Sequence, residues 1–479
     1  MTDLNFSSLP LSPKQLDNLQ SLGYRQMTPV QAESLPAMLA GRDLRVQAKT
    51  GSGKTVAFGL GLLNSVNPRF FAPQSLVLCP TRELAEQVGG EVRRLARAVA
   101  NIKLVILCGG KPFRPQAASL EHGAHIVVGT PGRVLDHLQR GTLKLNKLNT
   151  LVLDEADRML DMGFAEAVDE IIDQTPESRQ TLLFSATYSD EVEDICFSLL
   201  TDPVTVELET QHDADVIEQR LFKVVDDERD DTLLVLFHHY RPASALVFCH
   251  TKKQCADVAR WLRDQQISAL AIHGDLDQRE RDLVLAQFAN GSCCVLVATD
   301  VAARGLDIDA LPLVINYELP TDPEVYQHRI GRTGRAGQVG AAVSLFSPRE
   351  RRRVAVIESF IGVEIPQGSA ADLKRDPSYS LQPAMVTLEL DGGRRSKLRA
   401  GDILGALTGD AGLAGSAIGK IDIGDRSSLV AIETRVADQA LRFLSAGKIK
   451  GRAIRARRLG GARSRPGRTR HTGRRNQAE

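Results

Sequence analysis

The chain has 479 residues, 43% of them hydrophobic and 25% charged, and its net charge is +1. At roughly 100–200 residues per domain, this length predicts about three globular domains. No apolar run approaches the ~18 residues that a transmembrane helix requires, so we expect no membrane association. The start of the chain carries neither a basic nor an apolar segment, and none of the seven cysteines forms a Cys-x-x-Cys pair. We therefore expect a cytoplasmic protein with reduced cysteines.

The net charge near zero conceals a strongly basic C-terminal end. Residues Lys448 to Glu479 contain twelve Lys or Arg and one acid, a net charge of +11, which leaves −10 for the rest of the chain. A basic end on a mildly acidic body is typical of proteins that bind nucleic acid. A solubilising disordered tail has the same composition, so charge alone leaves both interpretations open.

Short apolar segments alternate with helical patterns in two successive stretches of the chain. The first stretch has candidate strands at Leu44–Gln47, Leu76–Cys79, Leu104–Leu107, Ile126–Val128, Leu151–Leu153 and Thr181–Phe184. The second has Ala245–Phe248, Ala269–Ile272, Val295–Ala298, Leu313–Ile315 and Ala342–Leu345. Near-continuous apolar strands indicate parallel sheets covered by helices on both faces. We therefore predict two tandem α/β domains, at residues 1–207 and 215–366.

A third, smaller unit follows a Gly-, Ser- and Pro-containing linker at residues 367–383. Its predicted elements are a strand at Val386–Leu390, a helix at Leu398–Leu407, strands at Ile418–Ile423 and Leu429–Thr434, a helix at Ala437–Leu444 and a strand at Ile449–Ala456. The order β-α-β-β-α-β predicts a split βαβ fold of the α+β class at residues 384–460. Residues 461–479 contain few apolar side chains and are predicted to be a disordered basic tail.

A glycine-rich loop at Ala48–Thr55 stands between a predicted strand and a predicted helix. Its glycines allow the backbone to wrap a phosphate, and the helix N-terminus adds positive potential. Lys54 is placed to reach the β- and γ-phosphates of a nucleotide, and Thr55 to ligate Mg²⁺. A generic P-loop starts with Gly where this chain has Ala48, and a simple tight turn is the alternative.

Two further charged groups fit phosphate chemistry. Asp154 and Glu155 follow a buried strand, where one carboxylate would hold Mg²⁺ and the other would polarise the attacking water. Arg332 and Arg335 are three residues apart and share a face if the segment is helical, so they could neutralise charge on a transferred phosphoryl group. A surface acid pair and a solvated basic helix are the alternatives.

These segments complete an ordered motif set that resembles the DEAD-box RNA helicases. In the first domain the motifs are Phe6 and Tyr24 upstream of Thr28–Gln31, then Ala48–Thr55, Pro80–Ala85, Gly109–Gly110, Thr130–Arg133, Asp154–Asp157 and Ser185–Thr187. In the second they are Val247–Thr251, Gln278–Arg281, Ala298–Asp307 and His328–Arg335. The resemblance spans roughly residues 4–365, and Ala48 in the P-loop is usual in that family. It implies two RecA-like domains and an RNA-stimulated ATPase that unwinds short duplexes locally.

The resemblance also implies roles for matching residues. The nucleotide would contact Phe6, Tyr24, Gln31, Ala48, Lys49, Thr50, Gly51, Ser52, Gly53, Lys54, Thr55 and Asp307. Catalysis would rest on Lys54, Glu155, Arg332 and Arg335, with Mg²⁺ on Thr55 and Asp154. Asp157, Ser185, Thr187 and His328 would couple the nucleotide site to RNA. The RNA groove would be lined by Thr81, Arg82, Gly110, Thr130, Arg133, Thr251, Arg281, Thr299 and Arg304. Hydroxyls, glycines and arginines suit a phosphate and 2′-OH track, although each Thr or Gly could instead be a cap or loop residue.

The third unit resembles an RNA recognition motif that lacks its stacking platform. Its first and third strands carry no aromatic residue, so it is not expected to stack single-stranded bases. Basic residues that could grip folded RNA are Arg394, Arg395, Lys397, Lys448, Lys450 and Arg452. Leu390–Arg399, Gly401–Ala406 and Lys450–Arg452 resemble a bacterial DEAD-box subfamily that binds a 23S ribosomal RNA hairpin and acts in assembly of the large (50S) ribosomal subunit. We therefore predict a monomer that acts on 23S RNA and pre-50S particles.

Three other functions remain open at this stage. A general or cold-shock RNA chaperone would share the core but not the 23S target. An ATP-gated RNA clamp would bind RNA without strong unwinding, although intact Lys54 and Glu155 argue against an inactive enzyme. A DNA helicase would not need contacts to the 2′-OH group.

Overall fold

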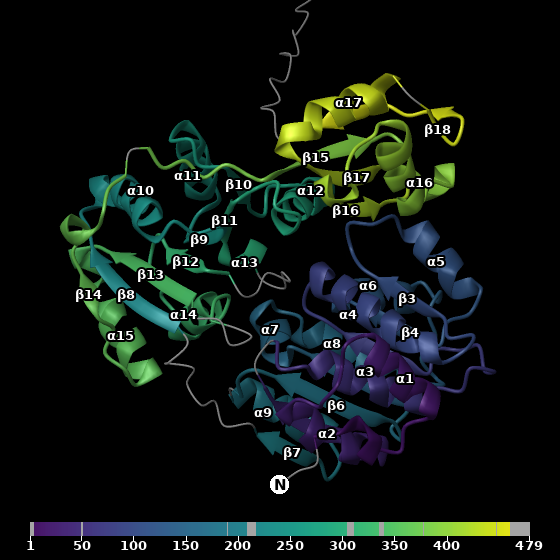
Figure 1. Ribbon diagram of the computed structural model, residues 1–479. Coiled ribbons are helices and arrows are strands. Elements are labelled where there is room, and N and C mark those ends of the chain that lie inside the picture. Colours follow the sequence, from purple (N-terminus) through teal and green to yellow (C-terminus); the bar gives the residue numbers. More distant parts are fainter. Residues whose placement is uncertain are drawn as a thin grey trace, which may run out of the picture. The chain divides into compact units, whose positions relative to one another are not determined.

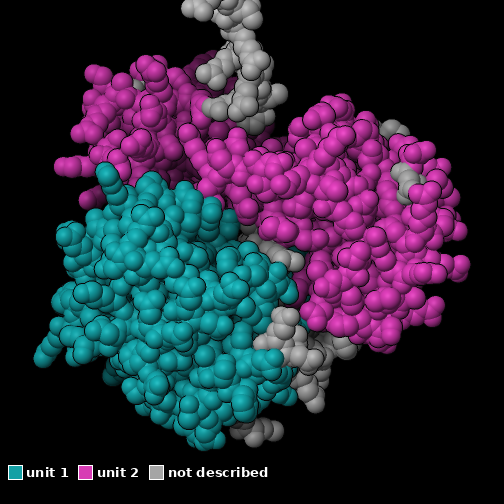
Figure 2. Space-filling view, turned by 180° about the vertical axis from the view of Figure 1, so that it is seen from behind, with its two compact units in different colours: residues 1–218, 303–310, 331–340 teal, residues 219–302, 311–330, 341–479 magenta. Residues whose placement is uncertain are grey.

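The computed structural model describes residues 4–48, 51–188, 190–207, 217–303, 311–334, 340–376, 378–446 and 448–459. These residues form two compact units (Figure 2). One unit holds residues 1–218 together with two short segments of the second half of the chain, and the other holds the remainder. Within the described part of the chain, no helix is long and apolar enough to cross a membrane.

The first unit is built on a seven-stranded parallel sheet (Figure 1). Its strands are β1 (Leu44–Gln47), β2 (Ser75–Leu78), β3 (Leu104–Leu107), β4 (Ile126–Gly129), β5 (Thr150–Asp154), β6 (Gln180–Ser185) and β7 (Val204–Glu207), in the order β3-β4-β2-β5-β6-β1-β7. The helices are α1 (Pro13–Ser21), α2 (Pro29–Leu39), α3 (Lys54–Ser65), α4 (Arg82–Leu95), α5 (Phe113–Glu121), α6 (Pro131–Gln139), α7 (Ala156–Asp161), α8 (Ala165–Ile172) and α9 (Asp190–Leu199). Two apolar clusters bury the two faces of the sheet, one around Val46, Val77 and Phe184 and the other around Leu76, Leu151 and Leu183.

The second unit contains another seven-stranded sheet with the same strand order. Its strands are β8 (Ile217–Lys223), β9 (Ala245–Cys249), β10 (Ala269–Ile272), β11 (Val295–Thr299), β12 (Leu313–Asn316), β13 (Gly340–Phe346) and β14 (Gln367–Gly368), in the order β10-β11-β9-β12-β13-β8-β14. Its helices are α10 (Arg229–Tyr240), α11 (Lys252–Asp264), α12 (Gln278–Ala289), α13 (Asp300–Ala303), α14 (Pro323–Ile330) and α15 (Arg351–Ile361).

The predicted linker at residues 367–383 runs along this second sheet domain. Its first residues form β14, which pairs in parallel with β8. Further along, Leu381 is buried in the core of the domain, and Leu373 and Tyr379 pack against it. Arg241 of the domain forms an ion pair with Asp376. The connection is therefore short and fixed to the domain along most of its length.

The third domain is a four-stranded antiparallel sheet with two helices. Strands β15 (Met385–Leu390), β16 (Ile418–Ile423), β17 (Ser428–Glu433) and β20 (Ala456–Arg458) are arranged in the order β16-β17-β15-β20. Helix α16 (Ala400–Gly405) continues into one π-turn at Ala406–Asp410, and the second helix is α17 (Ala437–Ala446). This arrangement confirms the predicted fold class of two parallel-sheet domains and an α+β domain.

The last strand differs from its prediction. Residues 449–456 do not form one strand, because Lys450 and Gly451 have positive φ angles of 51° and 75° and turn the chain back. A small hairpin of β18 (Lys448–Ile449) and β19 (Arg452–Ala453) results, and the sheet is completed only afterwards by β20. The apolar side chains Ile449 and Ile454 still reach the domain core, which explains why the pattern was mistaken for a strand.

Candidate functional site

The glycine-rich loop lies between β1 and α3, as the sequence predicts. Gly51 and Gly53 have φ angles of 84° and 97°, in the left-handed region that favours glycine. A Cβ on Gly53 would lie 2.5 Å from the Nε2 atom of Gln31, so only glycine fits there. Lys54 begins α3 with 6% of its surface exposed, and its Nζ donates to the carbonyl of Ala48 at 2.7 Å. The ammonium group is therefore held inside the loop. Lys49 and Thr50 lie outside the described residues.

Gln31 connects the start of α2 to this loop. Its Oε1 accepts from the backbone N–H of Thr28 at 3.0 Å in a capping box, which orients the amide. Its Nε2 donates to the carbonyl of Gly53 at 3.0 Å. The side chain is buried, so its position is set by the helix start and reports on the conformation of the loop.

The two aromatic residues predicted near the nucleotide both pack at the main apolar cluster of the first unit. Phe6 is 3% exposed and belongs to the main apolar cluster of the first unit. Tyr24 packs against the same cluster, and its hydroxyl donates to Glu91 at 2.8 Å. Burial and the neighbouring Glu91 raise the pKa of Tyr24 to about 12, so its hydroxyl stays protonated. Both residues support the segment that carries Gln31.

Asp154 ends β5 with 3% of its surface exposed. Burial raises its pKa to about 7, and Glu155 and Asp157 add to the rise while Lys54 opposes it. Its Oδ1 atom has no hydrogen-bond partner among the residues that the structure describes. A buried carboxylate with an unused oxygen is a group that a cation would stabilise.

Glu155 is the first residue after this strand and adopts a left-handed conformation, with φ 56°. Such a conformation is uncommon for a residue with a side chain and is concentrated at functional sites. Its carboxylate pairs with Arg158 at 2.7 Å, and both side chains are buried. Arg158 therefore fixes the orientation of Glu155, a role that the sequence did not reveal.

Asp157, Ser185 and Thr187 form one hydrogen-bonded network. The Oδ2 atom of Asp157 accepts from the backbone N–H of Ala186 at 3.1 Å, the N–H of Thr187 at 3.0 Å and the Thr187 hydroxyl at 3.1 Å. The Ser185 hydroxyl accepts from the N–H of Asp157, and the Ser185 carbonyl accepts from the N–H of Ala48. These hydrogen bonds directly connect the ends of β1, β5 and β6. The sequence alone does not show this connection.

The remaining predicted residues of the first unit lie where its strands end. Thr81 caps α4, and its hydroxyl accepts from the N–H of Leu84 at 3.2 Å. Gly110 has a positive φ of 73°, and Arg133 donates to the carbonyl of Lys111 at 3.0 Å. Two more members follow the same pattern: Arg82 begins α4, and Thr130 precedes α6. All are at the carboxyl edge, where parallel α/β sheets bind ligands.

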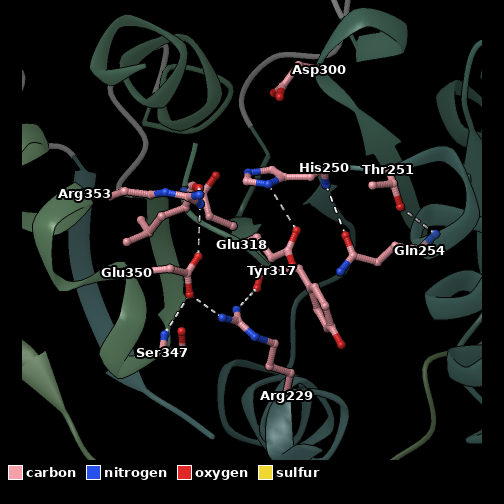
Figure 3. Close-up of polar contacts among 12 residues, drawn as sticks. Arg229, His250, Thr251, Gln254, Asp300, Tyr317, Glu318, Ser347, Glu350 and Arg353 are labelled. Carbon is pink, nitrogen blue, oxygen red and sulfur yellow. Dashed lines mark hydrogen bonds and ion pairs between the residues drawn. The ribbon is translucent and has the colours of Figure 1, made fainter. Parts of the chain in front are cut away.

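In the second sheet domain, Thr251 caps α11 in the same way, with the N–H of Gln254 at 3.2 Å (Figure 3). Thr299 ends β11 and is buried, while Arg281 on α12 donates to the carbonyl of Ala302 at 3.4 Å. His328 lies on α14, and Arg332 is buried just after that helix. Three predicted residues, Arg304, Asp307 and Arg335, lie outside the described residues.

The basic residues of the third domain come from two neighbouring segments. Arg394 and Arg395 lie in a 3₁₀ turn at Arg394–Ser396, and Lys397 follows with φ 57°. Arg452 donates to the carbonyl of Ser396 at 3.0 Å, which joins this turn to the β18–β19 hairpin. Lys450 pairs with Asp402 at 2.8 Å, whereas Lys448 is exposed. We call the turn and the hairpin together the basic cluster.

Comparison with known proteins adds to this geometry. Residues 28–195 match the DEAD/DEAH box helicase family, residues 228–337 the helicase conserved C-terminal domain, and residues 387–458 the DbpA RNA binding domain. The chain is 52% identical to the ATP-dependent RNA helicase DbpA of Escherichia coli over 95% of this chain and 99% of that protein. The chain belongs to the DbpA family of DEAD-box ATP-dependent RNA helicases.

Two further similarities agree with this assignment. DbpA of Bacillus subtilis is 38% identical over 94% of this chain and 98% of that protein. Yeast (S. cerevisiae) Dbp5 bound to RNA and ADP BeF3 has a TM-score of 0.70 and 32% identity, covering 77% of this chain and 96% of that one. This DEAD-box helicase is therefore an ATPase that acts on RNA, and its third domain is an RNA-binding domain.

One pair of residues in this helicase is not predicted by the sequence. Arg329 is 1% exposed and binds both carboxylate oxygens of Asp300, at 2.6 and 2.8 Å. It also donates to Asn316 and to the carbonyl of Glu318, and its guanidinium lies over Phe248. This bidentate pair joins the end of β11 to α14. Both residues stand inside predicted motifs, but nothing in a sequence shows that they face each other.

Proposed function

We propose that this helicase opens short duplexes in 23S ribosomal RNA during assembly of the large ribosomal subunit, at the expense of ATP. The observation that carries this proposal is the DbpA RNA binding domain at residues 387–458, whose sheet lacks aromatic residues and whose loops form the basic cluster. Such a domain fits a folded RNA held through phosphates and shape better than a single strand.

The nucleotide would bind in the loop between β1 and α3. Lys54 would exchange the carbonyl of Ala48 for the β- and γ-phosphates, and the N–H groups of residues 51–55 would surround them. Gln31 would read the adenine edge, next to Phe6 and Tyr24, and Asp307 would contact the ribose. The Gln31–Gly53 hydrogen bond supports this assignment, because it links base recognition to the phosphate loop.

The residues present also fit a magnesium ion. Thr55 and Asp154 would hold it, and the unpartnered Oδ1 atom of the buried Asp154 is the observation that supports this fit. When bound, Mg²⁺ neutralises charge on the phosphates. Hydrated Mg²⁺ needs few protein ligands because it keeps several waters, so one carboxylate and one hydroxyl suffice.

The proton and charge transfers would be handled by side chains of both sheet domains. Glu155, held by Arg158, would orient and polarise the attacking water. Arg332 and Arg335 of the second domain would neutralise charge on the transferred phosphoryl group. Because these groups belong to different domains, hydrolysis would require ATP to bring the domains together.

RNA would be gripped along its backbone by the carboxyl edges of both sheets. The proposed contacts are Thr81, Arg82, Gly110, Thr130, Arg133, Thr251, Arg281, Thr299 and Arg304. Asp157, Ser185, Thr187 and His328 would transmit the nucleotide state to these contacts, and the Asp157 network supports the first three. The basic cluster would hold a hairpin of 23S RNA, and the Arg-rich residues 461–479 would add general affinity. We further propose a cytoplasmic monomer.

The test is steady-state ATP hydrolysis at fixed salt by the full-length protein. Three conditions are compared: no RNA, an unrelated structured RNA, and a 23S fragment that contains the hairpin recognised by the subfamily. We expect strong stimulation by the 23S fragment alone. Equal stimulation by both RNAs would refute the 23S target, and binding of RNA without turnover would show a clamp.

A paired variant makes this test specific for the basic cluster. Replacing Arg394 and Arg452 by Gln should raise the concentration of 23S fragment needed for half-maximal stimulation by about tenfold, because each phosphate contact is lost. The matched control replaces Arg351 and Arg352, two exposed arginines on α15, and removes the same charge. An equal effect of both pairs would mean that only net charge matters.

A further inference from the structure

The sheet of the RNA-binding domain has two faces, and both are covered. On β15, Val386, Leu388 and Leu390 point into the domain core. Residues on a strand alternate between faces, so Thr387 and Glu389 point to the opposite face. Both are nevertheless buried. In an RNA recognition motif this second face is the one that stacks bases, and here the covered part around Thr387 and Glu389 is not open to them.

The cover comes from the second sheet domain, at both ends of α12. Near its start, Arg279 forms an ion pair with Glu389 at 2.8 Å. Just after its end, Asn290 donates to the Thr387 hydroxyl at 2.9 Å, and the Ser292 hydroxyl lies 2.9 Å from the same oxygen. A Cβ on Gly291 would contact Met385 at 3.8 Å. An ion pair between the exposed Arg279 and the buried Glu389, and a hydroxyl–amide cluster, thus join the two domains within the same unit.

Glu389 is the central group of this interface. Its side chain is 5% exposed and binds two arginines, Arg279 of α12 and Arg457 of the neighbouring strand β20. Burial alone would raise its pKa, but hydrogen bonds from Arg457 and Arg279 leave the pKa below its ordinary value. Glu389 is therefore a buried carboxylate that stays charged because guanidinium groups from two domains meet at it.

Helix α12 is only partly buried. Of its twelve residues, all of which the structure describes, Gln287 and Phe288 are buried and six more are half-buried. Arg281, two residues after Arg279, points about 200° away around the helix axis. It reaches the carbonyl of Ala302 on α13, the helix that follows Thr299. The helix is thus held on one side by the RNA-binding domain and on the other by the segment that carries proposed RNA contacts.

We propose that Glu389 is a positioning residue that couples the RNA-binding domain to helix α12 and hence to Arg281 in the helicase core. Through Arg279 it fixes α12 and Arg281 relative to the RNA-binding domain, so that only an RNA held by that domain depends on this contact to reach Arg281. A structured RNA held by the third domain is then presented to a core that is already aligned. This inference rests on the proposed function, and it treats the covered sheet face as an internal interface.

The test measures ATP turnover and RNA affinity separately, in the full-length protein. The variants are Glu389→Gln, Arg279→Gln and their combination, each with the hairpin-containing 23S fragment and with unstructured poly(U). Coupling free energies between sites typically correspond to 5- to 150-fold effects. We expect both single variants to lower kcat with the 23S fragment at least about fivefold, with unchanged hairpin affinity and unchanged turnover on poly(U). The double variant should be no worse than either single one, because they remove the same contact.

Two control variants separate positioning from folding. Arg457→Gln removes the partner of Glu389 inside the RNA-binding domain, so a merely structural role of Glu389 would make this variant as defective as Arg279→Gln. Arg260→Gln on α11 removes an arginine of similar exposure, 65% against 67%, that is also paired with an acid. It should behave like wild type.

Three outcomes would overturn the inference: equal loss with both RNAs, full turnover in both single variants, or additive effects in the double variant. They differ from a failure of the proposed function, which would show as wild-type protein that does not respond to the 23S fragment. In that case the same variants are compared on whichever structured RNA stimulates turnover. A loss confined to that RNA would still support the coupling, and no loss would refute it.

Discussion

The two seven-stranded sheets have the same strand order but differ in whether the cation at the start of the helix after the first strand is paired with a carboxylate in the described part of the chain. In each, the helix that follows the first strand begins with a cation, Lys54 of α3 and Arg229 of α10. Among the described residues, Lys54 donates to the backbone carbonyl of Ala48, and the buried Asp154 has an oxygen without a hydrogen-bond partner. Arg229 instead forms a buried ion pair with Glu350 and donates to the carbonyl of Tyr317 (Figure 3).

The difference shows how one scaffold acquires or loses a ligand site. In the second domain, Glu350 also pairs with Arg353 and accepts from the N–H of Ser347, so its charge is satisfied within the protein. In the first, we propose that phosphate and a cation would add stabilisation to the ammonium of Lys54 and the carboxylate of Asp154. Fold therefore identifies the edge of the sheet, and the residues at that edge decide whether it binds a nucleotide.

The largest effect is expected for Lys54→Ala. This substitution removes the cation that would contact the transferred phosphates, so ATP turnover should fall at least about 100-fold. The measurement is steady-state hydrolysis with saturating RNA, with thermal unfolding to verify the fold. Because Lys54 donates one hydrogen bond to the described part of the protein, stability should change little. Turnover within about threefold of wild type would remove Lys54 from the catalytic machinery.

The next largest effect is expected at β14, the seventh strand of the second sheet. A protein that ends at Pro366 lacks β14 and the buried Leu381, whereas one that ends at Gln382 keeps both. We expect the shorter protein to lose about 4 kcal/mol of unfolding free energy, from Leu381 and the half-buried Leu373 and Tyr379. Both truncations lack the RNA-binding domain, so the comparison isolates the connecting segment. Equal denaturation midpoints would show that residues 367–382 only tether the third domain.

Some features of the fold and site can be predicted from local sequence, and others depend on tertiary contacts. Apolar runs such as Leu76–Leu78 predict the parallel sheets, because a strand that is buried on both faces is apolar along its whole length. The Gly, Ser and Pro of residues 367–383 predict a linker, but composition does not show that Leu381 is buried in a neighbouring core. The P-loop and the acid pair are predicted from local spacing alone. Arg158, Arg329 and Glu389 were missed because their partners are set by tertiary contacts.

A third effect is expected at the buried ion pair between Arg229 and Glu350 in the second sheet domain. Arg229→Gln leaves Glu350 without its buried partner and should lower the free energy of unfolding by about 3 kcal/mol, since breaking a buried pair strands a charge. It should leave the concentration of ATP at half-maximal turnover unchanged. Chemical denaturation gives the stability, and steady-state kinetics gives the ATP dependence. A changed ATP dependence with normal stability would mean that this network belongs to the nucleotide site.

The smallest effects concern two threonines at equivalent positions of the two sheets. Thr81 follows β2 and caps α4, and Thr251 follows β9 and caps α11, each with a 3.2 Å hydrogen bond to the third residue of the helix segment that follows. Replacing either by Ala should cost about 1 kcal/mol of stability, whereas Thr→Ser should cost little because the hydroxyl remains.

RNA affinity then separates capping from recognition at these two residues. A capping hydroxyl accepts one hydrogen bond and can still donate its own proton, so the same group can cap a helix and bind a phosphate. Thr251 is exposed, whereas Thr81 is buried, so the Thr251 hydroxyl is the more accessible of the two. We therefore expect Thr251→Ala to weaken poly(U) binding more than Thr81→Ala does, at equal loss of stability. Equal binding by both variants and wild type would make both threonines caps alone, and the RNA track would have to rest on the arginines.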